Sequence, residues 1–290
     1  MKQLMKIMSL PQPLFFGLVV LALRLPAFAA DGAAQPAEAI DGFRDTPMLP
    51  GSRWHLHDPD RPQPRVVTPG TTFSHNAPAP SDAEVLFDGK DLSKWQNHRG
   101  QNATWKVQDG YLETGRGGGI RTRGKWADFQ LHVEWASPNP PRGTGQGRGN
   151  SGILINGMYE VQVLDSYQAK TYPDGQAAAI YGQSPPLVNA SKPPGEWQTY
   201  DIIFESPRWN EQGELVKKAC VTVLHNGVVA QHRYEFAGIT DGITGEVPWK
   251  SLAKYSRPHP PEVFIELQDH SNPVRYRNIW VRTLGEKEKP

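Results

Sequence analysis

Three short stretches of the sequence carry carboxylate, amide or imidazole side chains at alternate positions, with apolar residues between them. Residues two apart in a β-strand share one face, so each stretch should present its polar groups on one side of a sheet. Carboxylates and imidazoles can exchange protons, and amides can hydrogen-bond hydroxyl groups. One such strand is an ordinary solvated edge, whereas three together are typical of a lined cleft. The groups are Gln130, His132 and Glu134, then Glu160 and Gln162, then Glu266, Gln268 and His270.

The pair Asn156-Gly157 separates two apolar runs and predicts a type I′ turn, hence a tight β-hairpin. If the loop has two residues, directly opposed side chains share a face. Ile155 then faces Met158, Ile153 faces Glu160, and Ser151 faces Gln162. The other face, expected to be the core, would carry Gly152, Leu154, Tyr159, Val161 and Val163.

From Glu84 onward, short β-branched and aromatic runs are separated by Gly, Pro, Asn and Asp. Few stretches show a helical period over three turns. This pattern predicts an all-β fold, an antiparallel β-sandwich or jelly roll. The formal net charge of +1, with both signs spread along the chain, indicates no nucleic-acid surface. The single cysteine, Cys220, excludes an internal disulfide.

The N-terminus has the order of a secretory signal peptide. Lys2 and Lys6 precede an apolar run over 14–23, and the small-residue sequence Ala27-Phe28-Ala29 follows. The apolar run is too short for a stable membrane span. We therefore expect residues 1–29 to be removed and the product to be secreted or periplasmic, without a membrane anchor.

Residues 30–81 carry nine prolines and little apolar periodicity, which predicts an extended arm without its own core. His55 and His57 would point the same way on an extended chain and could offer metal ligands. The favoured interpretation is that Trp54 and Leu56 pack the arm against the domain. Residues 286–290 form a charged tail.

Six motifs resemble, in order, those of the 3-keto-disaccharide hydrolase domain, a family long catalogued as a domain of unknown function. The resemblance covers about residues 82–285. It implies a concanavalin A-like fold, with two curved sheets and sugars bound across the concave face, and cleavage of glycosides already oxidised to a ketone at C3. The motifs are LFDGKDLSKW at 86–95, WKVQDGYLE at 105–113, GNSGI at 149–153, YEVQVLD at 159–165, NASKPPGEW at 189–197 and LQDHSNPVRYRNIWVR at 267–282.

A ketone at C3 acidifies the hydrogen on C2, so such an enzyme needs a base near C2. It also needs a donor or cation near the C3 oxygen and an acid for the leaving oxygen. Glu160 is the expected base, because it is central on the polar face. Glu134 or His270 is the expected acid, and His270 could instead polarise the ketone.

Further residues are candidates for substrate binding. Gln162, Gln268 and Asn150 are expected to bind hydroxyl groups, and Lys192 could donate to the enolate oxygen. The family motifs also contain Asp165. Strict alternation turns Asp165 and Asn150 away from Glu160 unless a strand ends or bulges first. A divalent cation could assist the enolate, but the spacing defines no ligand set. The sequence does not indicate the oligomeric state.

Two other functions remain open. Lectin-like sandwiches often bind sugars without reacting, so the domain could be a binding module. A conventional glucanase-type hydrolase needs a carboxylate triad on one strand, whereas 159–165 supplies only Glu160 and Asp165, five residues apart. That spacing argues against the glucanase.

Overall fold

The computed structural model describes residues 40–71, 75–115, 117–239 and 247–285. The predicted signal peptide, 1–29, and the charged tail, 286–290, lie outside these residues. In the described part of the chain, regular structure is almost all β, with two single-turn 3-10 helices, η1 (Gly145–Gly147) and η2 (Pro173–Gly175). No described helix has the length and apolar character needed to cross a membrane.

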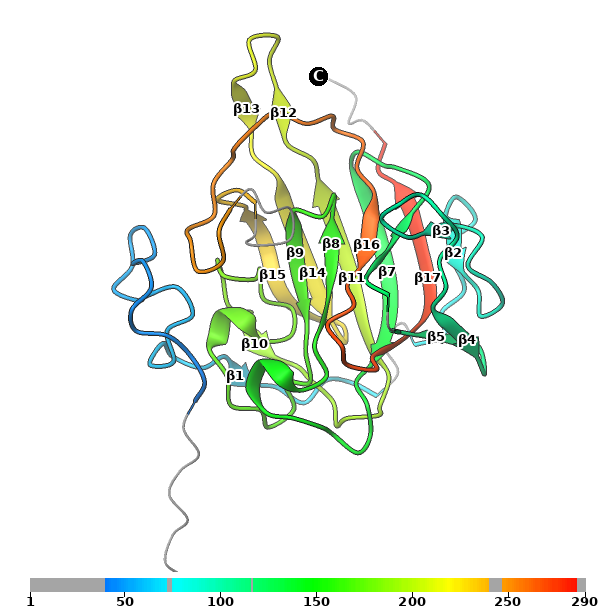
Figure 1. Cartoon of the computed structure of the whole chain (residues 1–290), viewed down its shortest axis with the longest axis horizontal. Coiled ribbons are helices and arrows are strands. Elements are labelled where there is room, and N and C mark those ends of the chain that lie inside the picture. The colour runs from blue at the N-terminus through cyan, green and yellow to red at the C-terminus, as the bar shows by residue number, and fades with distance from the viewer. Residues whose placement is uncertain (1–39, 72–74, 116, 240–246, 286–290) are drawn as a thin grey trace, which may run out of the picture. The chain divides into compact units, whose positions relative to one another are not determined.

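Two antiparallel sheets form a β-sandwich, which confirms the predicted fold class. Figure 1 shows β8, β9 and β16 in front of β14, β11 and β7. We call the two layers the large sheet and the small sheet. The large sheet has the order β15 (Val228–Glu235), β14 (Cys220–His225), β11 (Gln198–Glu205), β7 (Phe129–Ala136), β17 (Arg275–Thr283), β5 (Tyr111–Glu113) and β4 (Lys106–Gln108), and β2 (Glu84–Phe87) also pairs with β17. The small sheet has the order β3 (Trp95–Gln96), β6 (Ile120–Thr122), β16 (Ile265–Leu267), β8 (Ser151–Ile155) and β9 (Tyr159–Val163).

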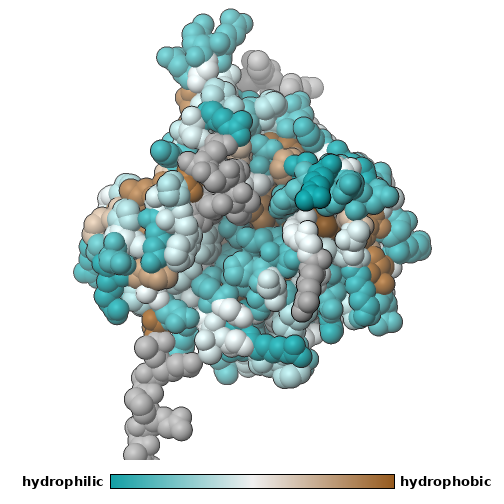
Figure 2. All heavy atoms as spheres, in the orientation of Figure 1, coloured by the Kyte–Doolittle hydropathy of each residue, from teal (hydrophilic) through white to brown (hydrophobic). Residues whose placement is uncertain are grey.

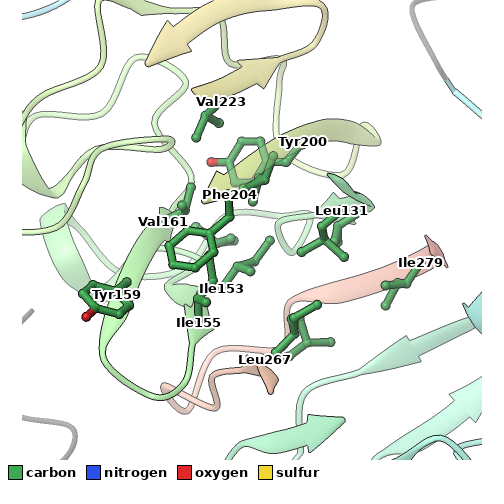
Figure 3. Packing of buried hydrophobic residues seen from close by; sticks show 14 of the residues in the cluster. Leu131, Ile153, Ile155, Tyr159, Val161, Tyr200, Phe204, Val223, Leu267 and Ile279 are labelled. Carbon is green, nitrogen blue, oxygen red and sulfur yellow. The ribbon is translucent and has the colours of Figure 1, made fainter. Parts of the chain in front are cut away.

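The core lies between the two sheets. Alternate residues of β7 (Phe129, Leu131, Val133 and Trp135) are buried, as the alternation predicts. They belong to one hydrophobic cluster with Val161 and Leu267 of the small sheet. Figure 3 shows side chains of both layers meeting around Tyr200 and Phe204 of β11. Each sheet therefore has one face in the core and one face turned outward.

The hairpin register differs from the prediction by one residue. Asn156 and Gly157 have the expected positive φ angles of 59° and 64°. However, Ile155 pairs with Tyr159, so Met158 is an extra residue in the loop. A one-residue slip moves every side chain of a strand to the other face. Ser151, Ile153 and Ile155 therefore face the core, and Gly152 and Leu154 lie with Glu160 and Gln162.

The N-terminal arm packs closely on the sandwich. β1 (Arg65–Val66) pairs in parallel with β10 (Val188–Asn189), and Leu56 is buried, while Trp54 is only half-buried. His57 has a φ of 59°, so the backbone turns where the sequence suggested an extended chain. His55 bonds to the carbonyl of Thr46 within the arm, whereas His57 lies against Asp174. The two histidines therefore do not form a shared metal site. A short hairpin of β12 (Arg208–Trp209) and β13 (Leu215–Lys217) completes the described strands.

Candidate active site

The outward face of the small sheet gathers most of the predicted polar groups. Glu160 and Gln162 alternate with Tyr159 and Val161, which are in the core, so both polar side chains point outward. Strand pairing lines them up with their neighbours in two rows, which we call the polar face. Hydrophilic residues gather over the middle of this side of the molecule in Figure 2. The first row is Arg121, Glu266, Leu154, Glu160 and Tyr181, and the second is Gln268, Gly152 and Gln162.

Gly152 leaves the space that the Glu160 carboxylate occupies. A Cβ on Gly152 would overlap Oε1 of Glu160, and it would lie 3.4 Å from Oε1 of Gln268. The carboxylate and the amide oxygen therefore approach each other above Gly152. Oε1 of Gln268 is buried and has no hydrogen-bond partner in the described structure. Such an oxygen is ready to accept a hydrogen bond from a ligand hydroxyl.

Glu266 and His98 form a second acid–base pair on the polar face. Nε2 of His98 lies 2.8 Å from Oε1 of Glu266. Burial raises the pKa of Glu266, and the nearby His98 and Arg121 partly oppose this rise. Leu154 separates Glu266 from Glu160, so the two carboxylates come from strands two apart, with backbones about 10 Å from each other. Glu266 belongs to a predicted polar stretch, but His98 lies in the loop between β3 and β4 and carries no strand signal.

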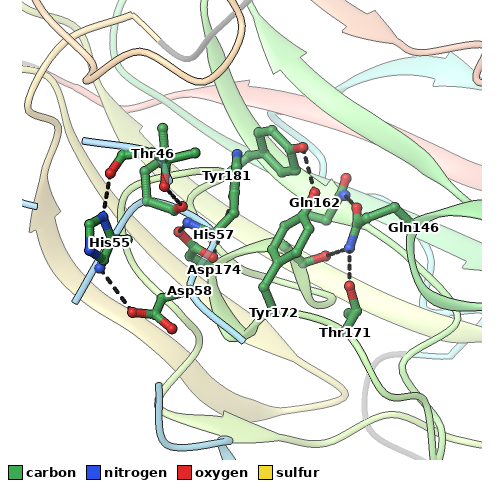
Figure 4. Close-up of polar contacts among 12 residues, drawn as sticks. Thr46, His55, His57, Asp58, Gln146, Gln162, Thr171, Tyr172, Asp174 and Tyr181 are labelled. Carbon is green, nitrogen blue, oxygen red and sulfur yellow. Dashed lines mark hydrogen bonds and ion pairs between the residues drawn. The ribbon is translucent and has the colours of Figure 1, made fainter. Parts of the chain in front are cut away.

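A chain of side-chain hydrogen bonds fixes the position of Gln162. Its Nε2 donates to Oε1 of Gln146 at 3.0 Å, and Nε2 of Gln146 donates to Oγ1 of Thr171 at 2.9 Å. Asn150 joins the same group, because its Nδ2 donates to the carbonyl of Gln146 at 2.7 Å. Figure 4 shows Gln162, Gln146 and Thr171 in sequence. Two of the predicted hydroxyl binders, Gln162 and Asn150, thus belong to one network.

Tyr181 is a residue of the polar face that the sequence reasoning missed. Ile180 bridges to Val161 in the core, so Tyr181 faces outward beside Glu160. The N–H of Tyr181 donates to the carbonyl of Glu160 at 3.3 Å. Its hydroxyl lies 2.8 Å from the hydroxyl of Tyr172. The sequence gave little signal, because 178–181 joins the sheet only through its pairing with β9.

The predicted grouping of Glu134 with Glu160 is wrong. Glu134 alternates with the core residues Val133 and Trp135 of the large sheet, so it points outward on the opposite side of the sandwich. Burial alone would raise the pKa of Glu134, but hydrogen bonds from His132, Asn278, Arg277 and the N–H of Asn76 outweigh it and lower this pKa to about 2. A carboxylate held ionised in this way is a poor proton donor.

The remaining predicted residues lie apart from the Glu160 carboxylate. Lys192 contacts His75, with Nζ and Nε2 3.1 Å apart, and burial lowers the pKa of Lys192, opposed by Glu196 and Glu134. Asp165 follows the end of β9 and pairs with Arg148 at 2.7 Å. Burial raises the pKa of Asp165, and Arg148 counteracts it. His270 is exposed in the loop after β16.

Among the described residues, no group of three or more His, Cys, Asp or Glu side chains has a metal-binding arrangement.

Comparison with known proteins agrees with this architecture. A curated 3-keto-disaccharide hydrolase of Bacteroides thetaiotaomicron is 25% identical over 257 residues, covering 71% of this chain and 80% of that protein. The crystal structure of a candidate glycosyl hydrolase from Parabacteroides distasonis has 45% sequence identity and a TM-score of 0.68, covering 77% of this chain and 93% of that one. The fold and these likenesses define a glycosidase-like β-sandwich protein. The chain belongs to the 3-keto-alpha-glucoside-1,2-lyase-like domain family, whose model matches residues 82–282.

Proposed function

We propose that the protein cleaves glycosides or disaccharides that carry a ketone at C3 of the sugar, with the polar face of the small sheet as the active site. The observation that carries this proposal is the position of Glu160. Its carboxylate lies over the bare backbone of Gly152, next to an unpartnered amide oxygen of Gln268. Family membership supports the class of substrate.

The chemistry requires one base and one acid. The base takes the hydrogen on C2 as a proton, and the electron pair of the C–H bond delocalises onto the C3 oxygen as an enolate. Collapse of the enolate forms a C1–C2 double bond and expels the substituent on C1, whose oxygen takes a proton from the acid. Water then adds its hydroxyl to C1 and a hydrogen to C2. General acid–base catalysis typically contributes about 10²- to 10⁴-fold for each such group.

Glu160 is the base in this proposal, and Glu266 with His98 supplies the proton for the leaving oxygen. Glu266 suits the acid role because burial favours its protonated form, and His98, which is more exposed, can return the proton from solvent. Gln162 and Gln268 bind hydroxyl groups of the sugar. Glu134 has no part in the reaction.

The test is aglycone release from a chemically prepared 3-keto-glucoside by the wild type and by Glu160→Gln. The variant should fold normally and lose about 10²- to 10⁴-fold in turnover. Glu262→Gln is the control, because Glu262 is exposed just before β16. Binding without release by the wild type would favour the lectin-like module, and release from the unoxidised glucoside would favour a conventional glycosidase. Activity before and after chelation tests whether a divalent cation takes part.

We also propose that the protein is exported, because residues 1–29 have the order of a signal peptide. The intact mass of the mature protein, compared with that expected from a start near Ala30, tests this.

A further inference from the structure

We propose that the N-terminal arm completes the active site, and that His57 is a positioning residue for Tyr181. This inference rests on the proposed function, because it gives the arm a role in binding the same keto-sugar. The arm precedes the region matched by the family model, 82–282. It therefore lies outside the part of the chain that the family model matches.

The arm contacts the loop formed by residues 171–182, which we call the wall loop. The N–H of His57 donates to Oδ2 of Asp174 at 3.0 Å, and Nδ1 of His57 lies 3.4 Å from Oδ1 of Asp174. Both side chains are fully buried. Asp41 bridges to Thr171, and Nε2 of Gln63 donates to the carbonyl of Thr171 at 3.2 Å. The wall loop thus contacts three separate points of the arm.

The ring of His57 also packs against the aromatic side chains of the wall loop. Its centroid lies 4.3 Å from that of Tyr172 and 5.0 Å from that of Tyr181. Gly182 has a φ of 68°, and a Cβ there would lie 3.2 Å from Cδ1 of Leu56. The arm therefore approaches so closely that it fixes both the backbone and the rings of the loop.

The wall loop in turn touches the polar face. The N–H of Tyr181 donates to the carbonyl of Glu160. Thr171 accepts a hydrogen bond from Gln146, and Gln146 accepts one from Gln162. Figure 4 shows Tyr172 and Tyr181 between the His57–Asp174 pair and Gln162. Apart from η2 and the pairing of 178–181 with β9, the loop has no regular structure, so the rest of its conformation depends on contacts with the arm. A loop released by the arm would leave Tyr181 and Gln162 without a fixed position for the sugar.

The test replaces His57 by Ala in the full-length protein, with His55→Ala as the matched control. His55 is the neighbouring histidine of the arm, but its ring bonds to Thr46 and not to the wall loop. His57→Ala should raise KM for the keto-sugar about tenfold with little change in kcat, because the wall loop loses the imidazole that packs against Asp174 and the two tyrosines, and therefore loosens. His57→Asn should recover part of this loss, because Asn tolerates the positive φ and keeps a polar group beside Asp174.

Amide hydrogen exchange of the wall loop is the second readout and needs no substrate. His57→Ala should speed exchange over 171–182 and leave β7 and β11 unchanged, whereas His55→Ala should leave the loop as in the wild type. Unchanged KM and unchanged loop exchange in folded His57→Ala would refute the proposal. If His57→Ala does not fold, Gln63→Ala is the second variant, because Gln63 is an exposed arm residue whose side chain bonds to Thr171 and Gln176 of the wall loop. It should give smaller changes of the same kind, and the absence of any change would refute the proposal. Altered exchange in an enzyme inactive on every keto-sugar would reject the proposed function while keeping the contact.

Discussion

The substitution Gly152→Ala separates catalysis from stability. The new methyl group would overlap Oε1 of Glu160 and lie 3.2 Å from its Cδ. Gly152 has no positive φ, so alanine fits the backbone there. The obstacle is the far end of a flexible side chain, which must rotate away.

The expected magnitudes follow from that geometry. Alanine in a strand gains about 0.5–1 kcal/mol over glycine, and crowding costs about 1–3 kcal/mol, so the free energy of unfolding should fall by no more than about 2.5 kcal/mol. The displaced carboxylate must move by about 1 Å or more, and a misplacement of that size costs about 10²-fold in rate.

The assay compares aglycone release and thermal unfolding of Gly152→Ala with those of the wild type. Gly70→Ala is the control, because no atom lies within 4 Å of a Cβ built there. A folded Gly152→Ala enzyme with full activity would refute the view that the Glu160 carboxylate works from its place above Gly152.

Three other substitutions test the roles of single residues. Glu266→Gln should slow release of a basic alkoxide aglycone about 10²-fold or more, but hardly affect a nitrophenolate that leaves without protonation; equal losses on both substrates would remove Glu266 from the acid role. Gln268→Ala should raise KM about tenfold through the loss of one hydrogen bond to the sugar, and unchanged KM would contradict that contact. Glu134 has a pKa of about 2 in the folded protein against an ordinary value of 4.5, so its stabilising contribution is complete above pH 4.5 and is lost as the pH falls towards 2. The stability difference between wild type and Glu134→Gln in urea unfolding should therefore shrink over that pH range, and a constant difference would contradict the shift.

Alternation predicted which side chains of single strands face outward. Glu160 and Gln162 are on the outward face, as are Glu266 and Gln268, because one face of each strand is buried and sequence parity is sufficient. Parity does not say which sheet a strand joins. Glu134 is also outward, but β7 lies between β11 and β17 in the large sheet, so its polar side faces away from Glu160. That outcome depends on pairing between segments far apart in the sequence.

The predictions for the hairpin register and for the loop residues failed for other physical reasons. The run 151–155 contains no alternating polar residue, so nothing in it reveals the extra loop residue Met158 that reverses its faces. Tyr181 and His98 lie outside the recognised strands and reach the polar face only through tertiary contacts. Packing of the arm against the domain was predicted, but the contact of His57 with Asp174 was not, because it joins residues 117 positions apart in the sequence.

The central claim is that Glu160 removes the hydrogen on C2 of the keto-sugar. The most direct measurement is the reaction in D₂O, with deuterium at C2 of the released sugar followed by mass spectrometry and NMR and corrected for exchange of the free product. The account predicts one deuterium at C2 for the wild type, and cleavage and exchange slowed together by about 10²-fold or more for Glu160→Gln. Cleavage by the wild type with hydrogen retained at C2, or full exchange by Glu160→Gln, would contradict it.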